Sequence, residues 1–287
     1  MSANRGVQDI SSLDIAQSNV KKDYGLSEMA YSYGYELRLK YSSFMQDTLN
    51  WVTENISDLL SQDASNILSL GCGSGVFDLM MLKAVRSHSE DWTLKGIDYS
   101  ARDIDLFRER LLLQPEDVRK RVRLEHREFS SSVTLGDEYD LITMIHFLHS
   151  FDEILPIINN ALRHLSANGK LLIVQQNSKG VAKLRKRFSS FLPNQKFYSS
   201  EQVKALFQSQ EIPFKSHLIN TFFDVSSLGK MSLDTLVLMS FCLSNDLSVL
   251  NAQKQEEIRN AFLCRAGKQP DGSLIIDEQM EVIICQR

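Results

Sequence analysis

A glycine-rich turn between two apolar segments constrains the fold of this chain more than any other feature. The segment from residue 67 to residue 82 reads ILSLGCGSGVFDLMML: an apolar run, three glycines in five residues, then apolar residues at helical spacing. Glycine adopts positive φ and lets a ligand approach the backbone. Where a strand hands over to a helix, such a turn forms either a small-molecule site or a tight turn without a ligand.

Strands and helices alternate along the chain. The predicted strands are 66–71, 92–98, 122–129, 140–145, 170–177, 214–225 and 280–287. The predicted helices are 27–60, 76–85, 100–113 with Ser100 as N-cap, 154–165 ending in a turn at 166–169, 199–210 with Ser199 or Ser200 as N-cap, 234–243 and 253–264. This alternation predicts a mostly parallel sheet with helices on both faces.

Composition excludes several classes of protein. A net charge of −4 over 287 residues argues against a nucleic-acid partner. The four cysteines form no CxxC pair, so we expect neither a metal site nor a disulfide framework. The N-terminus lacks an apolar signal segment, and no run approaches the ~20 apolar residues of a membrane span, so we expect a cytoplasmic protein without a membrane partner.

The domain organisation follows from the same pass along the chain. Residues 1 to about 25 are polar and patternless, which fits a frayed or lid segment. We predict an N-terminal helical cap over 1–60 and a larger domain over 61–287 with inserted helices, packed as one compact domain overall. The sequence does not specify the oligomeric state.

An acidic residue follows the glycine turn by one strand–helix unit. The predicted second strand ends in Asp98, where a carboxylate can hold the two hydroxyls of a ribose. The turn reads G-C-G-S-G rather than G-x-G-x-x-G, which disfavours a dehydrogenase. No lysine or arginine stands in or beside the turn in the sequence to neutralise a pyrophosphate. A turn and an acid in this order favour a nucleoside-containing ligand over a ligand-free turn.

With these residues the chain resembles class I S-adenosylmethionine-dependent methyltransferases. Their first motif looks like LSLGCGSGVFDL, and the acid that binds ribose ends their second strand. The resemblance implies a Rossmann-like fold with a mostly parallel central sheet and a C-terminal antiparallel strand region, and S-adenosylmethionine as cofactor. The implied cofactor-binding residues are Gly71, Gly73, Gly75, Asp98, Ser130 and Ile145.

From about residue 41 onward the chain is more narrowly similar to the histamine N-methyltransferase family. The matching stretches are ILSLGCGSGVFDLMML, YDLITMIHFLHSFDEILPIINNALRHL, GKLLIVQQNSKGVAKLRKRFSSFLPNQ, FYSSEQVKALF and EQMEVIICQR. This resemblance implies methylation of a small-molecule amine or ring nitrogen. It places catalytic candidates at His146 and Glu278, where that family carries glutamine and asparagine.

The same resemblance lines a substrate pocket with residues from several segments. The implied substrate-binding residues are Tyr35, Glu36, Tyr41, His149, Arg185 and Phe191. Several of these positions differ in residue type from that family, which argues against histamine as the acceptor. Two alternatives stay open: methylation of a hydroxyl on a natural product, and a non-catalytic protein that keeps the fold and binds a ligand.

Overall fold

The computed structural model describes residues 25–63, 65–192 and 197–286. Backbone contacts divide the chain into two units. Unit 1 comprises Met1–Ser42, Lys183–Lys196 and Phe223–Ile276, and unit 2 comprises Ser43–Ala182, Phe197–Phe222 and Asp277–Arg287. The sequence-based division at residue 60 stays a prediction about domains, and the predicted lid over residues 1–25 falls almost wholly outside the described residues.

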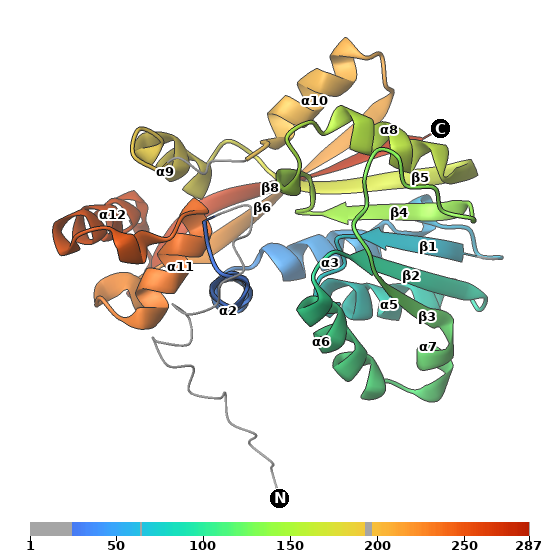
Figure 1. The fold of residues 1–287 in the computed structure, drawn as a ribbon, viewed down its shortest axis with the longest axis horizontal. Helices are drawn as coiled ribbons and strands as arrows, with labels where there is room; N and C mark the ends of the chain where they lie inside the picture. The colour runs from blue at the N-terminus through green and yellow to red at the C-terminus, as the bar shows by residue number, and fades with distance from the viewer. Residues whose placement is uncertain (1–24, 64, 193–196, 287) are drawn as a thin grey trace, which may run out of the picture. The chain divides into compact units, whose positions relative to one another are not determined.

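Unit 2 is built on a β-sheet, and the glycine turn follows the end of one of its strands. Its strands are β1 (Ser65–Leu70), β2 (Trp92–Asp98), β3 (Val122–His126), β4 (Tyr139–Ile145), β5 (Leu165–Gln176), β6 (Phe214–Asp224) and β8 (Leu274–Gln286), the last two of which continue into unit 1. The strand order is β3-β2-β1-β4-β5-β8-β6 (Figure 1). The first five strands pair in parallel and β8 pairs antiparallel to β5, as predicted.

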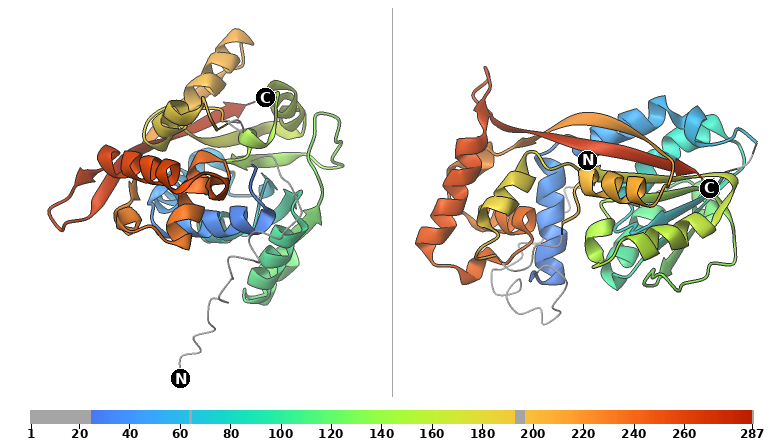
Figure 2. Two further views of the ribbon diagram at one scale, coloured as in Figure 1. Left: turned by 60° about the vertical axis from the view of Figure 1, so that its left-hand side comes forward. Right: turned by 90° about the horizontal axis from the view of Figure 1, so that it is seen from above.

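Helices cover both faces of this sheet. The helices of unit 2 are α3 (Phe44–Glu54), α4 (Ile56–Leu59), α5 (Val76–His88), α6 (Ala101–Leu112), α7 (Glu116–Arg121), α8 (Leu155–Arg163) and α10 (Ser200–Ser209). Helices α3 and α5 lie on one face, and α8 and α10 on the other (Figure 2). The apolar core beneath α8 and α10 includes Ile158 and Phe207, both fully buried. Because helices cover both faces of the parallel strands, β1, β4 and the second half of β5 are almost continuously buried.

Unit 1 is mainly helical. Its elements are α2 (Glu28–Lys40), α9 (Val181–Phe188), whose first two residues belong to unit 2, α11 (Leu233–Leu243), α12 (Ala252–Arg265) and β7 (Gly267–Lys268). Helix α2 packs closely on α11 at Gly34. A Cβ added there would lie only 2.5 Å from Cβ of Phe241. Strand β7 pairs antiparallel with the first residues of β8.

Two predicted helix caps are confirmed. The Ser100 side chain accepts a hydrogen bond from the backbone N–H of Asp103 and begins α6. Ser199, rather than Ser200, begins α10, where its hydroxyl and the Gln202 side chain form a reciprocal capping box.

Other predicted boundaries were wrong for local reasons. The predicted helix 27–60 is three helices, because the Ser42 hydroxyl and the Asn55 amide donate to the backbone carbonyls of Arg38 and Trp51 and so compete with helical bonding. The predicted turn 166–169 lies inside β5 as a bulge. Tyr139 pairs with Leu165, but two residues later Leu141 pairs with Lys170. Helix α7 was not predicted. No helix in the described ranges is both long and apolar enough to span a membrane.

Candidate functional site

The glycine turn stands at the carboxyl end of β1 and begins α5. Gly71, Gly73 and Gly75 all have positive φ, at 72°, 53° and 74°. The backbone N–H groups of Gly71 and Cys72 both donate to the carbonyl oxygen of Ile97, at 2.9 and 3.2 Å, which ties the turn to β2. The turn therefore requires glycine for its backbone conformation, as predicted.

The three glycines differ in what surrounds them. A Cβ at Gly71 would lie 2.4 Å from the Phe147 ring, and a Cβ at Gly75 would lie 2.2 Å from the Phe107 ring. A Cβ at Gly73 would meet nothing within 4 Å. Gly71 and Gly75 are thus required by packing within the protein, whereas Gly73 faces open space where a ligand can approach the backbone.

Asp98, at the end of β2, holds both the turn and the next helix. Its Oδ2 accepts from the backbone N–H of Gly73 at 2.9 Å, and its Oδ1 accepts from the backbone N–H of Ser100 at 2.8 Å. The side chain is buried. A carboxylate is an acceptor only, and the hydroxyls of a ribose are donors of the kind that it binds. The sequence predicted the pairing of turn and acid, but not this direct bond between them.

Acidic groups dominate the surroundings of the turn. Burial raises the pKa of the Cys72 thiol well above its usual value, and the carboxylates of Asp78, Asp98 and Asp103 raise it further. One cation does reach the turn: the Arg110 guanidinium, from α6, donates to the carbonyl oxygen of Ser74 at 2.7 Å. No lysine or arginine stands in or beside the turn in the sequence, but tertiary packing brings Arg110 to it from α6.

Asp78, in the first turn of α5, was missed by the sequence analysis. It is 2% exposed, and burial raises its pKa to about 6, with the Asp98 charge adding to the rise and a hydrogen bond from Ser69 opposing it. The sequence does carry a sign of this buried charge: Asp78 stands among the apolar residues of a helix predicted to be buried.

A second missed residue positions the predicted adenine-side segment. The Asn160 amide, on α8, donates to the backbone carbonyls of Ser130 and Val133, at 2.7 and 2.8 Å. Ser130 is half-buried, and its hydroxyl lies 3.2 Å from that of Ser132. Asn160 thus fixes the backbone that follows β3, where the resemblance implies a cofactor contact.

The end of β4 carries a strained residue. Ile145 is the last residue of the strand, and His146 follows it with φ of 51°, in the left-handed region that side chains other than glycine rarely adopt. The backbone N–H of His146 donates to the carbonyl of Val174 at 3.0 Å. Its ring meets the Phe44 ring edge-on, with centroids 5.0 Å apart. His149 lies in the 3-10 turn η1 (Leu148–Ser150) that follows.

Glu278, on β8, is buried and bonded. Its Oε1 accepts from the Gln176 amide at 2.7 Å and from the backbone N–H of Val181 at 3.4 Å. Gly180, with φ of 58°, packs so closely that a Cβ there would lie 2.6 Å from Cγ of Glu278. These contacts give Glu278 a structural role at the start of α9, and its role toward a substrate stays a prediction.

The other predicted substrate residues belong to unit 1. Tyr35 has its ring centroid 6.0 Å from that of Phe241, and Arg185 Nε donates to the Cys242 carbonyl at 2.6 Å. The remaining members of the predicted pocket are Glu36, which is exposed, and Tyr41 and Phe191, which are half-buried. For all five, contact with a substrate stays a prediction.

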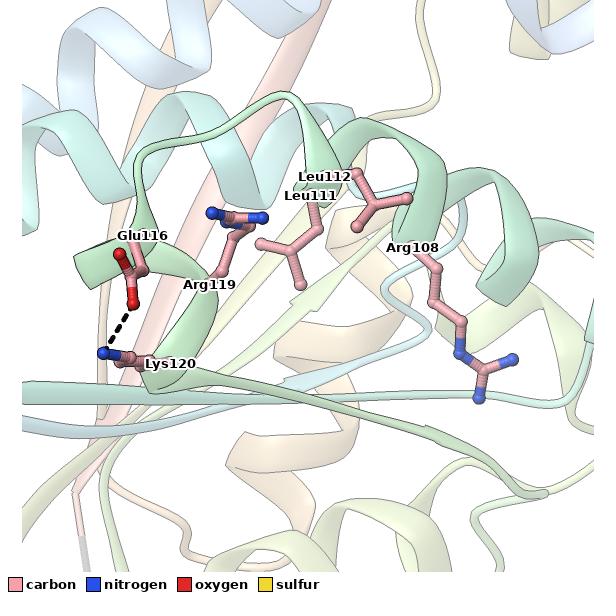
Figure 3. A pocket seen from close by; sticks show the side chains of 6 residues that line it. All are labelled: Arg108, Leu111, Leu112, Glu116, Arg119 and Lys120. Carbon is pink, nitrogen blue, oxygen red and sulfur yellow. Dashed lines mark ion pairs between the residues drawn. The ribbon is translucent and has the colours of Figure 1, made fainter.

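Two surface hollows of unit 2 are lined by residues other than the predicted site residues. One, of about 660 Å³, is lined by α6 and α7 and includes Leu111, Leu112 and an ion pair of 2.7 Å between Glu116 and Lys120 (Figure 3). The other, of about 480 Å³, includes the rings of Trp51 and His217, which are tilted by 42° with centroids 5.3 Å apart. Neither contains a predicted site residue. Within the described ranges no group of three His, Cys, Asp or Glu side chains is arranged to hold a metal ion.

Comparison with known families identifies the chain. A family model described as a methyltransferase domain matches residues 41–211, which contain the glycine turn, Asp98 and His146. The chain belongs to the methyltransferase domain family. As a methyltransferase it uses S-adenosylmethionine as cofactor. A search of curated proteins finds no match.

Solved structures confirm the methyltransferase fold. The YcgJ protein from Bacillus subtilis is 14% identical with a TM-score of 0.55, covering 83% of this chain and 97% of that one. A putative methyltransferase from Bacillus halodurans is 10% identical with a TM-score of 0.55, covering 82% and 97%. A putative sarcosine dimethylglycine methyltransferase from Galdieria sulphuraria is 13% identical with a TM-score of 0.50, covering 83% and 85%.

The residues around the turn fit the cofactor of a methyltransferase. Gly73 faces open space, so its backbone is accessible to a ligand, and the Asp98 carboxylate beside it suits a ribose. Asp98 supplies negative charge, which suits a cofactor that carries a sulfonium and an ammonium group and lacks phosphate. The adjacent carboxyl ends of β1 and β2 carry Gly71, Gly73, Gly75 and Asp98. Ser130 lies in the segment after β3, and Ile145 is the last residue of β4.

Proposed function

We propose that this methyltransferase methylates a small-molecule amine or ring nitrogen, as its resemblance to the histamine N-methyltransferase family implies. The observation that carries the proposal is the strained backbone of His146 at the end of β4. Strain of this kind costs about 1–3 kcal/mol and persists chiefly where a side chain must be held for function. The carboxyl end of a central parallel strand is also the edge where ligands bind in such sheets.

The chain's own residues bind the cofactor and handle the acceptor nitrogen in this reaction. Asp98 and the turn bind and orient the cofactor, and His146 accepts a proton from the acceptor nitrogen or orients it. When bound, S-adenosylmethionine would supply a methyl group, activated by its positively charged sulfur, for transfer to the lone pair of the acceptor nitrogen. Positioning of the two reactants supplies much of the rate gain.

The need for a nitrogen lone pair predicts the pH dependence. A protonated amine cannot attack, so activity should rise with pH through the pKa of the bound nitrogen or of its proton acceptor. An acceptor that is already neutral would give no such rise.

The experiment begins with a mass-spectrometric screen of amines, ring nitrogens and hydroxyls for products that gain a methyl group, with purified protein and S-adenosylmethionine. The identified acceptor is then tested with His146→Gln. If His146 is the base, kcat should fall by roughly 10²–10⁴. Methylation of hydroxyls alone would contradict the proposal in favour of O-methylation. Cofactor binding without turnover of any acceptor would favour a non-catalytic ligand-binding protein.

A further inference from the structure

A buried carboxylate in the first turn of α5, the helix that follows the glycine turn, has no role in the function described so far. Asp78 is 2% exposed, and the Ser69 hydroxyl of β1 donates a hydrogen bond to it. Its Oδ1 is fully buried and finds no hydrogen-bond partner within the described ranges. A buried charge is costly unless it is paired and hydrogen-bonded, so a half-satisfied carboxylate here calls for an explanation.

The groups around Asp78 destabilise its charged form. Asp98, at the end of β2, adds like charge, and the nearby Cys72 thiol in the turn is held protonated. The Ser69 hydroxyl and the backbone N–H of Asp78 itself offer hydrogen bonds, and both of these groups are neutral. The cation that reaches the turn, Arg110, donates to the Ser74 carbonyl. The N-terminal end of α5 favours an anion in its first turn, but by an amount smaller than the burial cost.

We propose that Asp78 is a positioning residue of the cofactor site, and that its carboxylate is the countercharge for the cationic methionyl half of S-adenosylmethionine. The proposal rests on the cofactor assigned above and deepens it. Asp78 lies three residues after Gly75, in the first turn of α5, and interacts electrostatically with Cys72 of the turn and with Asp98. A sulfonium and an ammonium group bound at the turn would therefore lie in the field of its carboxylate.

This arrangement couples cofactor binding to the protonation of Asp78. Without ligand, burial raises the pKa of Asp78 to about 6. A cation nearby favours the charged carboxylate and so lowers that pKa. Binding near pH 6 should then release a proton, and affinity should rise as the pH rises from 5 to 7.5. A pKa displacement of one unit corresponds to about a tenfold gain in affinity over that range.

Calorimetry in two buffers of different ionisation enthalpy measures the released proton directly. The three ligands differ in their cationic groups. S-adenosylmethionine carries a sulfonium and an ammonium group, S-adenosylhomocysteine carries the ammonium but no sulfonium, and 5′-methylthioadenosine carries neither. We expect proton release at pH 6 that is largest for S-adenosylmethionine, smaller for S-adenosylhomocysteine and absent for methylthioadenosine. This comparison uses the unmodified protein alone, so it does not depend on the folding of any variant.

Variants assign the proton to its residue. Asp78→Asn should abolish proton release and weaken S-adenosylhomocysteine binding while leaving methylthioadenosine binding within about twofold. Asp105→Asn removes an equal charge from the surface of α6, where Asp105 pairs with Arg108, and should change neither readout. Ser69→Ala removes the bond that lowers the pKa of Asp78, so proton release should peak at a higher pH.

The outcomes separate this proposal from the assigned cofactor. Binding of S-adenosylhomocysteine without proton release, or with release that Asp78→Asn retains, would overturn the role of Asp78 and leave the cofactor in place. Equal release with methylthioadenosine would also overturn it, because that ligand carries no cation. Absence of S-adenosylhomocysteine binding to the unmodified protein would overturn the cofactor assignment and this proposal together.

Discussion

Gly73 donates its backbone N–H to Oδ2 of Asp98 at 2.9 Å, so the acid expected to bind ribose also fixes the glycine turn. The same carboxylate accepts from the N–H of Ser100, whose hydroxyl begins α6. Asp98 thereby joins the turn after β1 to the helix after β2. Loss of this side chain should disturb the shape of the cofactor site as well as one contact within it.

The first prediction separates these two effects of Asp98. Asp98→Ala should weaken S-adenosylhomocysteine binding by about 1–3 kcal/mol, because the ribose hydroxyls of the ligand lose their acceptor. It should also lower the free energy of unfolding without ligand, because the backbone N–H groups of Gly73 and Ser100 lose theirs. Asp98→Asn keeps one acceptor oxygen and should lose less of both. Calorimetry and urea unfolding measure the two quantities, and unchanged affinity in Asp98→Ala would remove this residue from the site.

The second prediction contrasts two glycines of the turn. Gly75→Ala should destabilise the fold, because the new Cβ would overlap the buried Phe107 ring at 2.2 Å. Gly73→Ala meets no atom within 4 Å, so it should cost only backbone strain of about 1 kcal/mol and act mainly on cofactor binding. Thermal unfolding and S-adenosylhomocysteine titration of both variants check this order. A Gly73→Ala protein that binds normally would mean that no ligand approaches the backbone there.

The third prediction concerns the buried bonds of Glu278. Glu278→Ala should lower the free energy of unfolding by about 1–3 kcal/mol, because the Gln176 amide and the Val181 N–H lose an acceptor. Glu278→Gln keeps an acceptor and should lose less stability. If Glu278 also attracts a cationic substrate, Glu278→Gln should raise KM with little change in kcat. Equal stability of all three proteins in urea unfolding would contradict the structural role.

The fourth prediction follows from the pKa of Asp78. The folded-state pKa of about 6 lies above the usual value of 3.8, so this group stabilises the fold below pH 4, and that contribution is lost as the pH rises through 6. The loss amounts to about 3 kcal/mol in total. Without ligand, Asp78→Asn should therefore gain stability relative to the unmodified protein as the pH rises from 4 to 8. A constant difference in urea unfolding at pH 4 and pH 8 would contradict the buried charge.

Much of the fold could be predicted from sequence because local signals agreed with the packing. The strand 92–98 was predicted with its observed bounds, and Ser100 was predicted as the cap it proves to be. Segment 166–169 misled, because its small and polar residues are typical of a turn, yet the pairing of β5 with β4 continues past them as a bulge. Register of this kind depends on the neighbouring strand, which local sequence does not encode.

The sequence predicted where the glycine turn and Asp98 lie better than it predicted their tertiary contacts. Gly71, Gly73, Gly75 and Asp98 lie at adjacent strand ends, as the order of the predicted elements implied, and their contact with the cofactor stays a prediction. Arg110, Asn160 and Asp78 act through contacts between segments 9 to 36 residues apart, namely Ser74 to Arg110, Ser130 to Asn160 and Ser69 to Asp78. Such contacts appear only when the helices are packed on the sheet.

The measurement that tests the central claim most directly is calorimetric titration of the unmodified protein with S-adenosylhomocysteine and, separately, with NAD, each repeated on Asp98→Ala. The account predicts saturable binding of S-adenosylhomocysteine that weakens by about 1–3 kcal/mol in the variant, and no binding of NAD. Absence of S-adenosylhomocysteine binding, or NAD binding that depends on Asp98, would contradict it.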